Sequence, residues 1–328
     1  MKMRQSGLSL TALLVSLALG LVLSAAVIAL YLESKRQYLV GDEMARLQEN
    51  GRYAVNLLRR ELLLAGFFGG IDGSVLPPPP AAGPGCDVAG QWPLGPQPAI
   101  DLQPDYRGGP PRTVAGVNLD CLPALALQQG SDLLAIRRVA GEATLANGLY
   151  APGVSSPDSG HWYLRWYEHG ANASWWQAGR VDPAEAVAGS GSWYWRLYPR
   201  IFHVRRFSAE PADAIPTLCA AGLAPSGMLT QCLVEGVEYL RLEFGVDQSG
   251  DGVPDFYLRY PTAVQLQRAV SARIHLLQRG LTRLQGYRDN RQYRLGQTTV
   301  DIAGDGYLRR VFNATVQLRN AAVWPVAG

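Results

Sequence analysis

The stretch that decides the fold is Leu8–Leu32, LSLTALLVSLALGLVLSAAVIALYL, a run of 25 residues without one charged side chain. As an α-helix rising about 1.5 Å per residue, it would span about 37 Å and could cross a bilayer. Lys2 and Arg4 are the only charged side chains before it. Because positive flanks stay on the cytoplasmic side, we expect a cytoplasmic N-terminus and residues 33–328 outside.

A cleaved secretory signal is the rival interpretation of this run. The apolar region of such a signal spans about 7–15 residues and ends at small residues. Ala25-Ala26 resembles such an end, but the run is longer than a signal needs. The membrane-spanning interpretation is therefore preferred.

The helical pattern continues beyond Leu32. A polar segment, 33–38, is followed by apolar residues at the spacing of an amphipathic helix. They are Leu39, Met44, Leu47, Ala54, Leu57, Leu58, Leu62 and Ala65. Gly66 supplies a stop, and no proline comes before Pro77. One helix is predicted over about 8–65, with a transmembrane part at 8–32 and an amphipathic half at 33–66.

Three glycines weaken this predicted helix, each by about 1 kcal/mol relative to alanine. They are Gly20, Gly41 and Gly51.

The rest of the chain divides at about residue 125. Residues 67–125 are rich in proline and glycine, which is typical of a linker or of a long loop packed on a globule. Residues 126–328 contain short β-like runs between Gly, Pro, Asn and Asp turns. The runs are 133–139, 161–167, 192–198, 239–246, 256–260, 269–277 and 311–318. We therefore expect an α+β protein whose N-terminal helix packs on a mostly antiparallel sheet.

The four cysteines favour disulfides over a metal site. No two form a CxxC pair, and no histidine lies at metal-ligand spacing from them. An even number in an exported chain fits two bridges. Of three possible pairings, Cys86–Cys121 with Cys219–Cys232 is the simplest, because each bridge closes a local loop. The first bridge would make 67–125 a stapled loop.

One loop has the oxygen-rich spacing of a calcium site. In the sequence DQSGDGVPD, candidate ligands occur at positions one, three, five, seven and nine of an EF-hand-like loop. They are Asp247, Ser249, Asp251, the carbonyl of Val253, and Asp255. Leu258 stands where a bidentate glutamate would normally bind, although Glu243 or a water could complete the shell. The alternative is a polar turn whose aspartates bind only the backbone.

Aromatic residues gather in one segment. Six of the eight tryptophans lie between Trp162 and Trp195. Alternating aromatics in short strands are usually core, and an exposed binding or partner surface is the second interpretation.

The sequence shows no sign of catalysis or nucleic-acid binding. It contains no GxSxG, HExxH or Walker motif, so we do not expect an enzyme. The four histidines, His161, His169, His203 and His275, are scattered. The net charge is only +3 and leaves no basic footprint, which argues against a nucleic-acid partner.

Several segments together resemble a known family. The segment Arg4–Leu10, RQSGLSL, resembles the leader and cleavage point of type IV prepilins. Six further segments resemble the PilW-type minor pilins. They are Gln48–Ala54, Gly130–Asp132, Glu235–Glu238 with Phe244–Asp247, and Arg309–Phe312 with Leu318–Asn320. They occur in family order across nearly the whole chain.

The resemblance implies a minor pilin of a type IV pilus. A prepilin peptidase would cleave residues 1–7 after Gly7, and Leu8 would be N-methylated. The protein would wait in the inner membrane with a periplasmic globular domain and then join the surface pilus. Its partners would be other minor pilins, the major pilin and a PilY-type tip adhesin.

One residue departs from the pilin pattern. Pilins usually carry a glutamate at the fifth mature position, which is Ala12 here. In the family this carboxylate is thought to meet the amino terminus of a neighbouring subunit. Ala12 cannot do so, which favours a position at the filament tip, in a priming complex.

Two alternatives remain open from the sequence. A pseudopilin of type II secretion shares the leader and the fold. A periplasmic sugar-binding or enzymatic module on a single-pass anchor belongs to another class.

Overall fold

The computed structural model describes residues 9–71, 76–80, 86, 92–95, 98–168, 171–302 and 304–320. The chain divides into two units, residues 1–46 and 47–328. The first helix, α1 (Leu10–Leu64), contributes to both. Its bounds agree closely with the predicted helix over 8–65.

A glycine, Gly66, sets the end of α1. Gly66 has φ of +78°, a left-handed conformation that a glycine reaches without steric cost. Its N–H donates to the carbonyl of Arg137 at 3.0 Å, so the turn that ends the helix is fixed to the sheet. The predicted stop at Gly66 is therefore confirmed.

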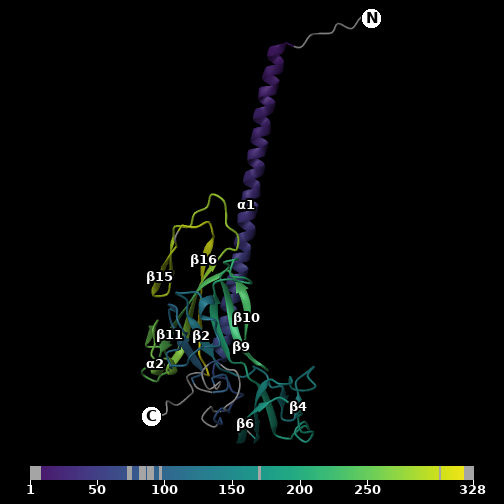
Figure 1. The fold of residues 1–328 in the computed structure, drawn as a ribbon, viewed down its shortest axis with the longest axis vertical. Coiled ribbons are helices and arrows are strands. Elements are labelled where there is room, and N and C mark those ends of the chain that lie inside the picture. The colour runs from purple at the N-terminus through teal and green to yellow at the C-terminus, as the bar shows by residue number, and fades with distance from the viewer. Residues whose placement is uncertain are drawn as a thin grey trace, which may run out of the picture. The chain divides into compact units, whose positions relative to one another are not determined.

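Four antiparallel β-sheets follow α1 (Figure 1). The first sheet has the order β1-β2-β8-β9-β10, and the second has β12-β11-β13-β16. A third, the inserted sheet, has β4-β3-β7-β5-β6, and β14-β15 is a separate hairpin. The predicted α+β class is confirmed.

The strands of the first sheet are β1 (Ile100–Gln103), β2 (Leu133–Ile136), β8 (Arg200–Arg205), β9 (Thr217–Ala224) and β10 (Gly227–Glu235). Those of the second are β11 (Val237–Val246), β12 (Phe256–Leu258), β13 (Ala269–Arg279) and β16 (Arg309–Gln317). The inserted sheet contains β3 (Leu145–Ala146), β4 (Leu149–Tyr150), β5 (Trp162–Tyr167), β6 (Ala171–Gln177) and β7 (Ser192–Arg196). The hairpin is β14 (Gln292–Leu295) with β15 (Thr298–Asp301), and the short helices are η2 (Ala124–Ala126) and α2 (Ala263–Gln267).

The main core lies where α1 meets the first two sheets. Ala54, Leu58 and Leu62 are fully buried there against residues such as Phe202 and Phe244. They recur at three- to four-residue intervals, as expected for one apolar stripe of a helix. Residues 47–64 of α1 are thus part of the globule's interior, as the amphipathic pattern predicts.

An ion pair joins the same helix to the end of the first sheet. Arg138 donates two bonds to the Glu61 carboxylate, at 2.8 and 2.9 Å, and both side chains are buried. Each charge needs the other, because an unpaired charge at this depth would cost several kcal/mol.

The inserted sheet lies between two strands that are neighbours in the first sheet. Residues 137–199 connect β2 to β8, and Ile136 stands opposite Arg200 in their antiparallel pairing. Between them the chain builds β3 to β7. In Figure 1 the labels β4 and β6 lie apart from those of β2, β9 and β10.

The proline-rich region contributes to the globule. β1 lies within 67–125 and pairs with β2, so the strand content begins before the proposed boundary at 126. Its register sets Ile100 opposite Ile136. Cys86, also in this region, is fully buried in a cluster with Tyr106 and Leu119.

Candidate functional site

The first candidate site is the apolar part of α1. Residues 10–32 are exposed throughout, including Leu13, Leu21 and Leu30. The helix is long and apolar enough to cross a membrane. So large an exposed apolar surface would not be stable in water, which makes a membrane or other helices its expected surroundings.

Two predicted sites occur at the beginning of this helix. The cleavage and methylation residues, Gly7 and Leu8, lie outside the described residues. Ala12 lies in the first turns of α1 and is exposed.

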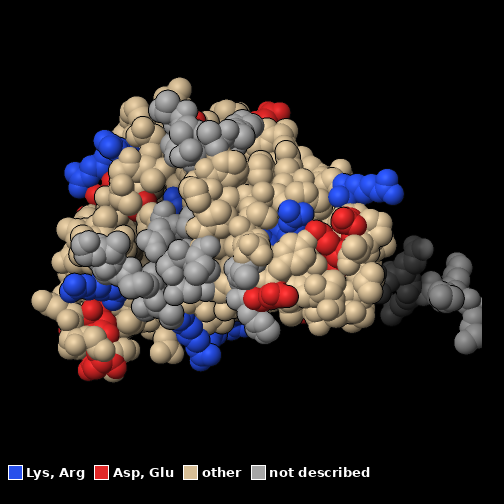
Figure 2. All heavy atoms as spheres, turned by 90° about the horizontal axis from the view of Figure 1, so that it is seen from below, with Lys and Arg blue, Asp and Glu red and all other residues tan. Residues whose placement is uncertain are grey.

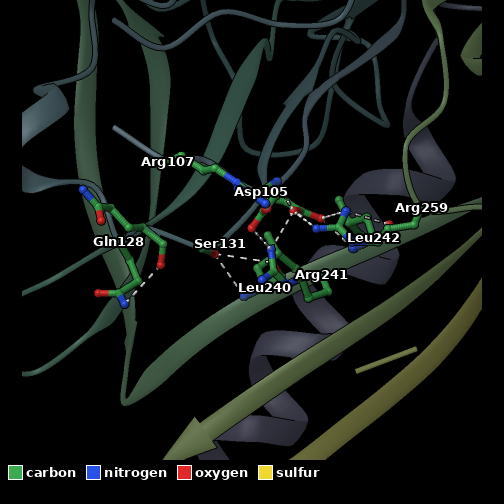
Figure 3. Close-up of polar contacts among 10 residues, drawn as sticks. Asp105, Arg107, Gln128, Ser131, Leu240, Arg241, Leu242 and Arg259 are labelled. Carbon is green, nitrogen blue, oxygen red and sulfur yellow. Dashed lines mark hydrogen bonds and ion pairs between the residues drawn. The ribbon is translucent and has the colours of Figure 1, made fainter. Parts of the chain in front are cut away.

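The second candidate is a buried polar network around Asp132, which directly precedes β2 (Figure 3). The Asp132 carboxylate accepts two bonds from Arg259, at 2.8 and 2.5 Å. A nitrogen of Arg241 lies 3.5 Å away. The backbone N–H groups of Asp105 and Leu242 also donate to it, at 2.9 and 2.8 Å.

The network joins four parts of the chain, which contribute Asp105, Ser131 with Asp132, residues 240–242 of β11, and Arg259. Ser131 receives the N–H of Leu240 at 3.0 Å, and Asp132 donates its own N–H to the Leu240 carbonyl at 2.9 Å. The segment Gly130–Asp132 is therefore tied to the middle of β11. Arg241 belongs to β11, and Arg259 directly follows β12. Figure 3 shows both side chains in the network beside Asp105 and Ser131.

The electrostatics of the network follow from its burial. Burial raises the pKa of the Asp132 carboxyl, against the opposing effect of Arg259. Asp105 is less enclosed, and there the effect of desolvation is outweighed by Arg107 and Arg241, which lower its pKa. The mutual pairing of these buried charges indicates a structural role, although the Nε atoms of Arg241 and Arg259 are buried without a hydrogen-bond partner.

A second polar cluster surrounds Arg309 at the start of β16. Its guanidinium binds Glu238 and Asp305, each at 2.6 Å at the closest, and lies 3.4 Å from Asp289. The hydrogen bond from Arg309 lowers the pKa of Asp305. The cluster fixes β16 to the beginning of β11.

The segments that resemble PilW therefore contact each other or the part of β11 that joins two of them. Gly130–Asp132 binds β11, and Glu238 binds Arg309. Gly51 of α1 lies against the ring of Phe312. Sequence spacing could not predict these partners, because each pair is separated by more than 70 residues.

Both disulfides have the pairing that the sequence favours. Cys86 is bonded to Cys121, and Cys219 to Cys232. Cys219 and Cys232 stand directly opposite each other on β9 and β10. The second bridge thus closes a hairpin, and the first closes a loop within the proline-rich region.

The candidate calcium loop forms a turn in which backbone N–H groups of the loop donate hydrogen bonds to its carboxylates. Asp247 accepts from the N–H groups of Gly250 and Gly252, at 2.6 and 2.7 Å. Asp255 accepts from Gln248 and Ser249, at 2.7 and 3.1 Å. The Gly252 bond is the main cause of a lowered pKa at Asp247.

The loop's other candidate ligands do not complete a metal shell. Asp251 accepts from the N–H of Val253 at 2.8 Å. Glu243 accepts from Gln297 and lies beside His275, at another place on the second sheet. Among the described residues, no three His, Cys, Asp or Glu side chains are grouped to hold a metal. The geometry favours the polar turn.

The aromatic segment forms the two faces of the inserted sheet. Trp166 stacks on Trp193, with ring centroids 5.1 Å apart, and Trp193 on Trp195 at 6.1 Å. Phe67, just after α1, meets Trp195 edge-on at 5.5 Å. Tyr163 and Tyr194 are buried on the other face. Most of these rings are core or half-buried, which favours the core interpretation.

The described histidines do not form a catalytic group. His203 is buried on β8, and burial lowers its pKa to about 4. His275 bonds to Asn313 at 2.8 Å on the neighbouring strand. His169 lies outside the described residues.

The surface view agrees with the modest net charge. On the face drawn in Figure 2, Lys, Arg, Asp and Glu side chains are scattered among uncharged residues. This face carries no continuous basic patch of the kind that nucleic-acid binding needs.

Taken together, the fold and the sites define an α+β protein carried on a long apolar helix, with structural polar clusters. Residues 201–320 match the family model PilW, type IV pilus-assembly protein W. The match supports a PilW-type pilus protein and confirms the predicted resemblance over rather more than a third of the chain. No significant match was found among curated proteins or among solved structures.

Proposed function

We propose that the protein is a minor subunit of a type IV pilus. The observation that carries the proposal is α1: one side of residues 47–64 packs into the core of the globule, while residues 10–32 of the same helix expose only uncharged, mostly apolar side chains. Such a helix is suited to span a bilayer before assembly and then to pack among other apolar helices in a filament. The family match to pilus assembly supports the same conclusion.

The proposed maturation is cleavage after Gly7 by a prepilin peptidase, followed by methylation of Leu8. Mass spectrometry of the mature N-terminus tests it. We expect N-methyl-Leu8 at the first position, and Gly7→Trp should leave the longer form. A mature chain that starts after Ala25 or Ala26 would contradict the proposal.

The proposed position is at or next to the filament tip, within a priming complex that presents an adhesin. Ala12 supports it, because alanine offers no carboxylate to the amino terminus of a subunit above. A subunit with nothing above it does not need that contact. The competing explanation of Ala12 is that alanine suits a bilayer, where an acidic residue costs about 2.5–3.5 kcal/mol on insertion scales.

Two measurements test the position. Deleting the gene should cut the number of pili sharply, while Ala12→Glu should change it little. Immunogold labelling should mark filament ends. Labels spread evenly along the shafts would exclude the tip, and unchanged piliation in the deletion strain would exclude the pilus role.

A further inference from the structure

A groove of about 400 Å³ runs between α1 and β16. The helix contributes Arg52, Val55, Asn56 and Arg59, and the strand contributes residues 312–315. None of these lining residues is acidic. Neither arginine has a carboxylate partner within the described part of the chain, and both are exposed. Among the residues that the structure describes, the groove is therefore a cationic surface without a paired carboxylate.

One wall of the groove is the open edge of a sheet. β16 is the last strand of the second sheet and pairs only with β13 among the described strands. The N–H of Leu318 bonds to Val270 of β13, and antiparallel pairing alternates along the strand. The N–H groups of Asn313 and Thr315 consequently point away from β13. An open edge of this kind can accept another strand.

We propose that this groove binds an acidic, extended segment of another pilus subunit, which adds as a strand to β16 and places carboxylates against Arg52 and Arg59. The subunit identity rests on the proposed function; the acidic, extended character rests on the groove.

The distance between the two arginines predicts the spacing of the carboxylates in the bound segment. Arg52 and Arg59 are seven residues apart, or about 10.5 Å along the helix. On one face of a strand, side chains two and four residues apart are separated by about 7 and 13 Å. The segment therefore carries two carboxylates two or four residues apart.

Photocrosslinking in pilus-producing cells tests the proposal on the full chain. A benzoylphenylalanine at Asn56 should crosslink to a second pilus subunit, and mass spectrometry should find the crosslink in a segment with the predicted carboxylate spacing. Arg52→Glu with Arg59→Glu should lower the yield at least tenfold. The matched control is Arg180→Glu with Arg288→Glu, two exposed arginines away from the groove, which should not change it.

A second pair of variants tests strand addition separately from charge. Thr315→Pro removes an outward N–H and should lower the yield, whereas Thr315→Val should not. Restoring the yield of the Arg52/Arg59 reversal by placing arginines in the identified segment would support the contact directly. Equal thermal stability of the variants excludes a folding effect.

Failure of the groove assignment can be told apart from failure of the proposed pilus function. Crosslinks to lipid, to a second copy of this chain or to an uncharged segment would overturn the proposal, as would an absence of crosslinks. If deleting the gene still cuts the number of pili sharply in that case, the pilus function stands and only the groove assignment fails.

Discussion

At the residue scale, Gly51 shows how a local rule is reversed by packing. By helix propensity, any glycine inside α1 weakens it. The structure places Gly51 directly under Phe312, so that a Cβ there would overlap the ring. Gly41 has nothing within 4 Å of the same position. Helix propensity alone treats the two glycines alike, but the packing predicts opposite effects on stability when each is replaced by alanine.

Gly51→Ala should therefore destabilise the globule, although alanine favours helix. The strain of overpacking, about 1–3 kcal/mol, exceeds the gain of about 1 kcal/mol in propensity. Gly41→Ala is the control and should be neutral or stabilising. Urea unfolding of both variants measures the difference. A Gly51→Ala protein as stable as the Gly41→Ala protein would show that Phe312 moves aside freely.

His203 should make stability depend on pH in a mildly acidic range. Burial lowers its pKa from 6.5 to about 4, so the folded state favours the neutral ring. This contribution is fully present above pH 6.5 and is lost as pH falls towards 4, by about 3 kcal/mol in all. Urea unfolding between pH 7 and pH 4 should show the loss, and His203→Gln should flatten it. An equally steep profile in the variant would assign the loss to other groups.

At the element scale, the two disulfides close loops of different length. In the chain-entropy model, a separation of 35 residues is worth about 4 kcal/mol, and one of 13 about 3 kcal/mol. Replacing Cys86 and Cys121 by alanine should therefore destabilise the protein more than replacing Cys219 and Cys232. Thermal unfolding of the two double variants measures the order. The reverse order would show that the β9–β10 hairpin depends on its bridge more than loop length indicates.

The loop of Asp247 should be stable without calcium. Its carboxylates are already occupied by backbone N–H groups, so EDTA should leave the melting temperature unchanged. Asp247→Ala should lower that temperature by removing the acceptor for two glycine N–H groups. A rise in melting temperature on adding calcium, abolished by Asp251→Ala, would instead establish the calcium site.

The sequence predicts some elements better than others for physical reasons. α1 is long and periodic, and its end at Gly66 is marked. Seven strand runs were predicted close to observed strands. The predicted runs do not include β1, β3, β4, β6, β8, β9, β10, β14 or β15. β9 shows one reason, because its small, mostly apolar sequence TLCAAGLA lacks the alternation of a half-buried strand.

Among the candidate sites, those formed by residues close in sequence could be predicted, and those formed by distant residues could not. The cysteine pairing is local, so chain separation was sufficient to favour it. The partners of Asp132 and Arg309 come from distant strands, and no spacing rule links them. The cationic groove was also missed, because Arg52 and Arg59 gain meaning only beside the edge of β16.

At the scale of the whole molecule, the two units should behave differently in water. A fragment that begins at Glu33 keeps residues 47–64, which the core needs, and omits the exposed apolar residues 10–32. We expect it to be soluble and folded without detergent, while the full chain needs detergent or lipid. Gel filtration and circular dichroism of both forms measure this. Aggregation of the fragment would show that the globule needs the rest of α1.

The inserted sheet has a consequence for how such a protein can change. Its chain leaves and re-enters the first sheet at neighbouring positions, where Val139 also bridges to Leu197. The insertion thus has its two ends side by side, so that a different module could join β2 to β8 at the same two points. Its interior also packs on residues outside it, because Phe67 meets Trp195 and Trp175 donates to the Pro77 carbonyl. A replacement module would therefore have to supply those contacts as well. The matched segment begins at residue 201, directly after this insertion.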